Sequence, residues 1–261
     1  MFNFKNKKIL ITGSLGLIGF NLTKTLMKYG AKLILIDNNQ HEKKKIHFLK
    51  KKNQFLNLID VSDEEQVKKF FLKNKKKMSN LSSIVNLAAI DAKIGNKIDN
   101  FEKEFDNYDN DLIKKSLDVN LFGTLNISKA ACKIFKKNGN GNIINVASLY
   151  SIVAPNKKLY GLNKNKNKPS DYIISKSTIP NLTRFIAAHY ADRGIRVNCI
   201  VPHGIENKHS KKFKRSFADL SPMGRMCKIR EIVDPIIFLL SDGSTYMNGS
   251  TVVVDGGWSA W

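Results

Sequence analysis

Two tyrosine–lysine pairs in this sequence have a spacing suited to proton transfer at a carbonyl oxygen. Tyr160 precedes Lys164 by four residues, and Tyr172 precedes Lys176 by the same interval. On a helix this interval places both side chains on one face, where the ammonium group can lower the pKa of the phenol, about 10 when unperturbed. Such a tyrosine can protonate a forming alkoxide or deprotonate an alcohol. Ser148 could hydrogen-bond the same substrate oxygen, or it could simply cap a strand end.

A glycine-rich segment near the N-terminus is suited to bind a dinucleotide. It lies between an apolar run at 9–11 and an amphipathic run at 18–28. Glycines in such a turn let the backbone approach a pyrophosphate, whose charge then lies at the N-terminus of the following helix. The residues predicted to contact the cofactor in this turn are Gly13, Ser14, Gly16, Leu17, Ile18 and Gly19.

Acidic residues end the next two apolar runs. Asp37 follows Gly13 by 24 residues, close to the interval expected of a ribose-binding carboxylate. A carboxylate accepts hydrogen bonds from a free 2′-hydroxyl and repels a 2′-phosphate, and neither Ser14 nor Asn38 is a cation that could hold that phosphate. We therefore expect NAD rather than NADP, although Asp37 could be a plain turn residue. Asp60 could accept a hydrogen bond from the adenine amino group, or cap a helix.

The elements that must position these residues alternate along the chain. Apolar runs predict strands over 9–11, 33–36, 55–61, 83–87, 142–147, 196–201 and 251–254. Amphipathic runs predict helices over 18–28, 63–78, 112–137, 172–191 and 231–240. Apolar strands separated by helices are typical of a parallel sheet covered on both faces, so we predict one doubly wound, Rossmann-like α/β domain over residues 1–261. Loops 91–111 and 155–170 should border the ligand crevice.

An ordered set of short motifs runs the length of the chain. It comprises Thr12-Gly13, Asp60-Val61, Asn86-Leu87-Ala88-Ala89, Val119-Asn120 with Gly123, Ala147-Ser148, Tyr172 with Ser175-Lys176, Arg196-Val197-Asn198 and Asp255-Gly256-Gly257. Together these motifs resemble the short-chain dehydrogenase/reductase family, over essentially the whole chain. The resemblance implies an oxidoreductase that moves a hydride between a nicotinamide cofactor and a carbonyl or secondary alcohol.

The same resemblance implies roles for individual residues. The implied catalytic set is Asn120, Ser148, Tyr172 and Lys176. In that set Lys176 also binds the nicotinamide ribose, and Asn120 holds a water in a proton relay. The further residues that it places at the cofactor are Val61, Asn86, Ala88, Tyr172, Lys176, Pro202, Gly204 and Ile205.

The choice between the two tyrosines depends on their surroundings. The family's usual gap after Ser148 would select Tyr160. We choose Tyr172, because its helical segment leads into the family's motif at 194–198, whereas Tyr160 is followed by Gly161, several asparagines and Pro169, which form helices poorly. The segment 155–170 is then an insertion beside the active site.

Other departures from the family pattern point to a subgroup. The glycine spacing, the insertion and a tail with Trp258 and Trp261 resemble members that act in bacterial surface-glycan synthesis, on flagellin or lipopolysaccharide sugars. We expect the two tryptophans to pack in the core or at a subunit interface. His203, between Pro202 and Gly204, is expected to be a surface substitution, with contact to cofactor or substrate as the alternative.

Composition limits the other functions. The net charge is +22, but only six of the 44 basic residues are arginine and the lysines are scattered, which favours a solvated surface and anionic substrates over nucleic acid. Cys132, Cys199 and Cys227 have neither disulfide nor metal-ligand spacing, so we expect no metal and a cytoplasmic location. No apolar run approaches the roughly 18 residues of a membrane helix. The family resemblance suggests a homotetramer or homodimer.

Three functions remain open at this stage. The leading hypothesis is an NAD-dependent dehydrogenase of a sugar, sugar phosphate or nucleotide sugar. The alternative is a 3-oxoacyl-[acyl-carrier-protein] reductase, against which Asp37 argues because those reductases usually prefer NADPH. A catalytically silent dinucleotide- or nucleic-acid-binding protein is the non-enzyme alternative, and the complete catalytic set argues against it.

Overall fold

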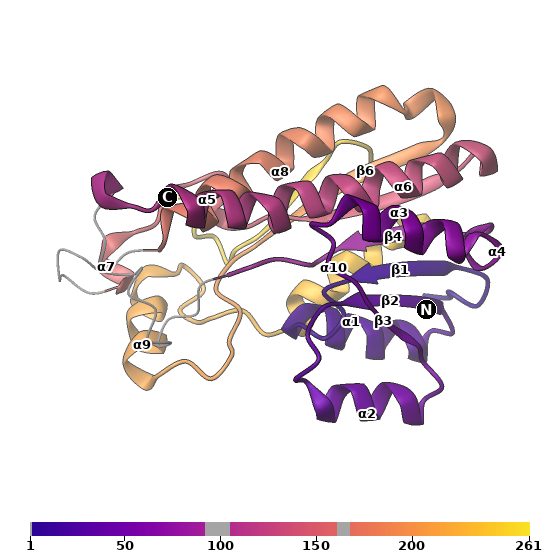
Figure 1. Ribbon diagram of the computed structural model, residues 1–261. Coiled ribbons are helices and arrows are strands. Elements are labelled where there is room, and N and C mark those ends of the chain that lie inside the picture. Colours follow the sequence, from indigo (N-terminus) through magenta and orange to yellow (C-terminus); the bar gives the residue numbers. More distant parts are fainter. Residues whose placement is uncertain (1, 92–104, 161–167) are drawn as a thin grey trace.

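Seven parallel strands form one sheet in the computed structural model, which describes residues 2–91, 105–160 and 168–261 (Figure 1). The strands are β1 (Lys8–Thr12), β2 (Lys32–Asp37), β3 (Leu56–Leu58), β4 (Ser83–Asn86), β5 (Gly141–Val146), β6 (Ile195–Pro202) and β7 (Thr251–Val254). Their order across the sheet is β3-β2-β1-β4-β5-β6-β7. The direction of winding reverses between β1 and β4, where this fold opens a crevice beyond the strand ends. The predicted doubly wound α/β fold is confirmed.

Helices cover both faces of the sheet. They are α1 (Leu17–Lys28), α2 (Lys43–Lys51), α3 (Glu64–Lys73), α4 (Lys75–Met78), α5 (Asn110–Leu117), α6 (Gly123–Asn138), α7 (Lys157–Tyr160), α8 (Ser170–His189), α9 (Lys211–Leu220) and α10 (Arg230–Leu240). Figure 1 shows α6 and α8 along one face and α1 along the other. None of the helices within the described ranges is long and apolar enough to span a bilayer.

The central strand β1 shows why its middle residues, Ile9 to Ile11, are all apolar. Successive side chains of a strand point to opposite faces. Ile9 and Ile11 pack into the core beneath α1 and α10, and Leu10 packs into the core beneath α3 and α6. All three are fully buried, and each burial contributes about 2–3 kcal/mol. This two-sided burial fixes the position of the turn that follows β1.

Several predicted boundaries are corrected by the structure. The strand predicted over 55–61 is reduced to β3, and the helix predicted over 63–78 is divided between α3 and α4 at Asn74. The helix predicted over 112–137 consists of α5, a π-helical segment at Asp118–Phe122, and α6.

Three helices that were not predicted, α2, α7 and α9, border the crevice. In α2 and α9 the apolar positions stand among lysines, so their helical spacing was not recognised in the sequence. These positions are Ile46 and Leu49 in α2, and Phe213, Phe217 and Leu220 in α9.

Candidate active site

A crevice of about 2110 Å³ opens beyond the carboxyl ends of the strands. It is larger than the roughly 300–1,000 Å³ of ordinary small-molecule pockets, so it has room for a dinucleotide and a substrate together. Most of the predicted site residues line it: Gly13, Gly16, Leu17, Ile18, Gly19, Asp37, Asp60, Val61, Ala88, Ser148, Tyr172, Lys176, Pro202, Gly204 and Ile205. The contacts of these residues with a cofactor stay a prediction.

The turn after β1 has no space for side chains at two of its glycines. Gly13 has a φ of +62°, and a Cβ there would lie 2.8 Å from backbone atoms of Leu87 and Ala88. A Cβ at Gly19 would lie 2.2 Å from the carbonyl oxygen of Gly13. Helix α1 begins after Gly16 without a side-chain cap from any described residue, so the N–H groups of its first turn remain available for an anion. This geometry fits the pyrophosphate of a dinucleotide.

Asp37 ends β2 at the rim of the same crevice, with 9% of its surface exposed. Its Oδ2 accepts a hydrogen bond from the backbone N–H of Leu15 at 2.8 Å, and its Oδ1 accepts one from the N–H of Asn39 at 2.9 Å. These bonds fix the carboxylate and leave lone pairs on both oxygens for two ribose hydroxyls. The residues present therefore fit a dinucleotide with a free 2′-hydroxyl.

Lys45 lies close to this carboxylate and was missed by the sequence analysis. Its Nζ donates to the carbonyl oxygen of Leu15 at 2.6 Å and pairs with Glu42 at 3.1 Å. Both charged side chains line the crevice. The signal that could have found Lys45 is the helical spacing of Ile46 and Leu49, which places Lys45 on a helix facing the glycine turn.

Three predicted residues do not line the crevice. Ser14 is buried, and its hydroxyl has no hydrogen-bond partner in the described part of the chain. The amide nitrogen of Asn86 donates to Ser128 at 3.1 Å and to Asn145 at 2.9 Å, inside the protein. The third is Asn120. These three side chains therefore lie inside the protein, behind the wall of the crevice.

The side chains of Ser148, Tyr172 and Lys176 come together in the crevice. Ser148 follows β5, and its hydroxyl is close enough to the phenol of Tyr172, in the first turn of α8, to lower the pKa of that phenol. One helical turn further on, Nζ of Lys176 donates to the carbonyl oxygen of Val146 at 2.9 Å. The end of β5 thus fixes the ammonium group of Lys176 one helical turn from the phenol of Tyr172.

Burial dominates the acidity of both titratable groups. It raises the pKa of Tyr172 above its ordinary value, and the hydrogen bond from Ser148 opposes that rise. Burial lowers the pKa of Lys176 to about 8. At neutral pH the phenol is therefore protonated and most of the lysine is an ammonium ion, which suits proton donation to a carbonyl.

Tyr160, the rejected alternative, also lines the crevice, from α7. Its hydroxyl lies 2.7 Å from that of Tyr150, and burial raises its pKa well above the ordinary value. Its predicted partner Lys164 lies outside the described residues. Ser148 acts on the phenol of Tyr172, whereas the hydroxyl of Tyr160 is paired with that of Tyr150, and the choice of Tyr172 stays our prediction.

Asn120 lies in the π-helical segment and is fully buried. Its Oδ1 accepts from the N–H of Ile90 at 2.7 Å, while its amide nitrogen donates to the carbonyl oxygen of Ile90 at 3.1 Å and to Oγ of Ser175 at 2.8 Å. The side chain thereby joins the segment after β4 to α8 next to Lys176. The relay water stays a prediction.

A buried carboxylate fixes the start of α8. Asp171 accepts a hydrogen bond from the hydroxyl of Tyr108 at 2.7 Å with Oδ1 and another from Ser116 of α5 with Oδ2. Because Asp171 directly precedes Tyr172, these bonds anchor the backbone that carries the phenol. The sequence showed an acidic residue in the first helical turn but not its partners.

His203 is buried, so the expectation of a surface position is wrong. Only 7% of its surface is exposed, and its ring lies among Tyr150, Phe217 and Trp258, with centroid distances of 5.5, 5.1 and 4.5 Å. Its Nε2 has no hydrogen-bond partner among the described residues. Burial lowers the pKa of His203 to about 4, so it is a neutral imidazole in the crevice wall.

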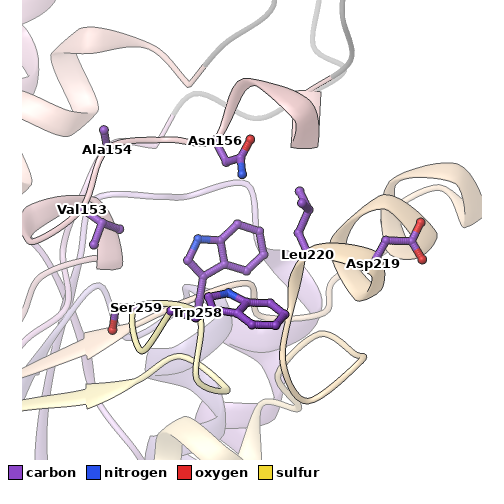
Figure 2. Close-up of a pocket in the computed structure, with 8 residues that line it drawn as sticks. Val153, Ala154, Asn156, Asp219, Leu220, Trp258 and Ser259 are labelled. Atoms are coloured by element: carbon purple, nitrogen blue, oxygen red, sulfur yellow. The ribbon is translucent and has the colours of Figure 1, made fainter.

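The two tryptophans of the tail differ in their environment. Trp258 is buried as expected, whereas Trp261 is 80% exposed. Both border a cavity of about 320 Å³ that is separate from the crevice. Figure 2 shows its lining residues, which come from the segment after β5, the end of α9 and the tail. Packing in the core is thus confirmed for Trp258 alone.

Comparisons with known proteins agree with the fold and the crevice. Residues 16–259 match the family described as Enoyl-(Acyl carrier protein) reductase. The chain is 30% identical to the short-chain dehydrogenase/reductase aba4 of Botryotinia fuckeliana, over 98% of this chain and 97% of that protein. It is 28% identical to post-translational flagellin modification protein A of Campylobacter coli, over 97% and 98% of the two chains.

A solved structure shows the same architecture. The short-chain dehydrogenase from Leptospira borgpetersenii with bound NAD+ is similar with a TM-score of 0.84 and 27% identity, over 98% of this chain and 94% of that one. Together these matches show that the protein is an oxidoreductase of the short-chain dehydrogenase/reductase family, which acts on alcohol or ketone groups with NAD or NADP.

Proposed function

We propose that this enzyme interconverts a secondary alcohol and a carbonyl on a sugar, sugar phosphate or nucleotide sugar, with NAD as its cofactor, in surface-glycan synthesis. The observation that carries the chemistry is that Ser148 and Tyr172 line the same crevice as the glycine turn, with Lys176 one helical turn from the phenol. The likeness to a flagellin modification protein supports the glycan role.

The cofactor preference rests on Asp37. Its fixed carboxylate supports binding of two ribose hydroxyls and repels a 2′-phosphate. In this proposal the glycine turn and the first turn of α1 hold the pyrophosphate. When bound, the nicotinamide ring supplies the hydride acceptor or donor.

The residues of the chain carry the proton chemistry. Ser148 orients the substrate oxygen by a hydrogen bond, and Tyr172 donates a proton to that oxygen in reduction or accepts one in oxidation. The ammonium of Lys176 favours the ionised phenol and binds the ribose hydroxyls. Asn120 fixes the position of α8, the helix that carries Tyr172 and Lys176, through its hydrogen bond to Ser175.

The charge of the crevice supports an anionic substrate. Lys208, in the segment after β6, and Lys212, on α9, line the crevice together with His209. Lys208 has a φ of +55°, a backbone conformation that costs energy for a residue other than glycine and that is often found at functional sites. Phosphate groups of a sugar phosphate or a nucleotide sugar suit such a lining.

A reductase of acyl-carrier-protein thioesters is the second candidate. The description of the matching family favours it, and an acidic carrier protein would suit the same lysines. The cofactor separates the two candidates, because Asp37 disfavours NADPH. For the location and assembly we propose the cytoplasm, which the three free cysteines support, and a homotetramer or homodimer, in line with the family.

The test is a screen that follows nicotinamide absorbance with NAD and NADP. The substrates are phosphorylated sugars, nucleotide sugars and an acetoacetyl thioester. We expect turnover of a sugar derivative with NAD. Turnover of the thioester alone, with NADPH, would instead establish the second candidate.

Two tyrosine variants then test the catalytic assignment. Tyr172→Phe should lower kcat by at least about a hundredfold, the usual contribution of a general acid or base, while NADH binding measured by fluorescence stays unchanged. Tyr160→Phe is the matched control and should retain most of kcat. If the Tyr160 variant loses turnover and the Tyr172 variant retains it, the assignment is wrong.

A further inference from the structure

Lys168 brings a second cation to the phenol at the centre of the site. It belongs to the insertion 155–170, directly before α8, and lines the crevice. Only 9% of its side chain is exposed. Since lysine side chains are rarely buried without a specific interaction, its contacts call for an explanation.

The ammonium of Lys168 lies over the face of the Tyr172 ring, with Nζ 4.2 Å from the ring centroid. A cation within about 6 Å of an aromatic face is attracted by the electron density of the ring, and more strongly where water is excluded. Ionisation of the phenol adds negative charge to the same ring, so the attraction to Lys168 is stronger in the phenolate form. The contact therefore makes Tyr172 more acidic.

Asp91 holds the ammonium in this place. Its carboxylate, half exposed after β4, forms an ion pair and hydrogen bond with Nζ of Lys168. The negative charge of Asp91 has the opposite effect on the phenol and raises the pKa of Tyr172. The two members of the pair therefore change the acidity of Tyr172 in opposite directions.

Groups from every neighbouring segment face the phenol. They are Asp91 after β4, Ser148 and Tyr150 after β5, Tyr160 on α7, and Lys168 and Lys176 before and on α8. Among these groups, Lys168 and Lys176 are the two cations.

We propose that Lys168 is a positioning residue for the reaction: it acts through Tyr172 by stabilising the ionised ring from its face, and Asp91 sets its place and strength. This deepens the proposed function, on which it rests for the role of Tyr172. In alcohol oxidation the ionised phenol is the form that accepts the proton. The insertion thus supplies a means of activating the tyrosine in addition to Lys176.

The experiment measures the ionisation of residue 172 directly, without a substrate. A ring-fluorinated tyrosine is incorporated at position 172 of the full-length chain, and its 19F resonance is followed during a pH titration. Fluorination makes the phenol more acidic and brings its ionisation into the pH range where the protein is folded, which far-UV circular dichroism confirms. The label is identical in all variants, so differences between them report the neighbours.

Four variants decide the result. Lys168→Met should raise the pH midpoint of the label by about one unit, a tenfold change in acidity, and Lys168→Arg should keep it near that of the parent. Asp91→Asn should lower the midpoint. Lys212→Met, which removes a lysine of the same crevice from α9, is the matched control and should have little effect.

Two results would overturn the proposal. One is an unchanged or lowered midpoint in Lys168→Met. The other is an equal rise in Lys212→Met, which would show a general field rather than a contact. If Lys168→Met does not fold, Lys168→Gln, which also removes the charge, takes its place and must raise the midpoint as well. Turnover by Tyr172→Phe would refute the catalytic role of Tyr172 but leave this titration unaffected, so the two failures are distinguishable.

Discussion

The buried imidazole of His203 should make the protein sensitive to mild acid. Burial lowers its pKa from the ordinary 6.5 to about 4. Because the folded-state pKa lies below that of the unfolded chain, only the unfolded state takes up a proton between these two values. The stabilisation is therefore complete above pH 6.5 and is lost as the pH falls towards 4. The shift corresponds to about 3 kcal/mol in total, of which about 2 kcal/mol is lost at pH 5.

Urea unfolding at pH 7 and pH 5, at one protein concentration, tests this value. In His203→Phe the ring that packs against Trp258 is kept and the titration is removed. The parent should lose about 2 kcal/mol more than this variant between the two pH values. With a slope of about 3 kcal/mol per molar urea, that is a difference of about 0.7 M in midpoint. His41→Gln, at an exposed histidine, should behave as the parent does. Equal losses in the parent and in His203→Phe would refute the reasoning.

Three further substitutions test the supports of the site. Asp37→Ala should weaken NAD binding about 10–100-fold and improve NADP binding, since Lys45 then meets a phosphate without a competing carboxylate; unchanged selectivity in calorimetry contradicts this. Gly13→Ala should abolish nucleotide binding measured by fluorescence, because the added Cβ would lie 2.8 Å from backbone atoms, and retained affinity would show that the turn can relax. Asp171→Ala should cost about 2–4 kcal/mol of unfolding free energy, since two hydroxyl groups lose their acceptor; a loss below 1 kcal/mol argues against the anchor.

The central parts of the fold could be predicted because their residues are buried on two sides. The buried positions of β1 and the whole of β5 are uncharged, the glycine turn directly follows β1, and Asp37 ends β2. Ser148 and Tyr172 could be placed in one crevice because both follow the carboxyl ends of strands in the expected winding order.

The predictions that failed concern elements whose structure depends on contacts between distant segments. In α9 the apolar positions Phe213 and Phe217 are separated by two basic residues and a serine, so the sequence does not show an apolar face. The helix is stabilised by the packing of Phe217 against His203 and Trp258. The contact of Lys168 with Tyr172 depends on the path of an insertion, about which helix and strand patterns give no information. Likewise, the side chain of Asn120 could not be oriented without knowing where the helix changes its pitch.

That change of pitch, at Asp118–Phe122, has a consequence for how the gene can vary. A π-helical segment holds one residue more than the α-helix would in the same length. Loss of a single codon there would restore regular α-helical winding with almost no net rotation between α5 and α6, because the extra residue and the wider turn are lost together. The link through Asp171 would be kept, whereas the hydrogen bonds of Asn120 to Ile90 and Ser175 would be lost with the segment that places its side chain. Between 155 and 170, by contrast, we expect extra codons to be tolerated, because this segment is itself an insertion relative to the family pattern. We expect related sequences to differ freely in length at the second place and to keep their length at the first.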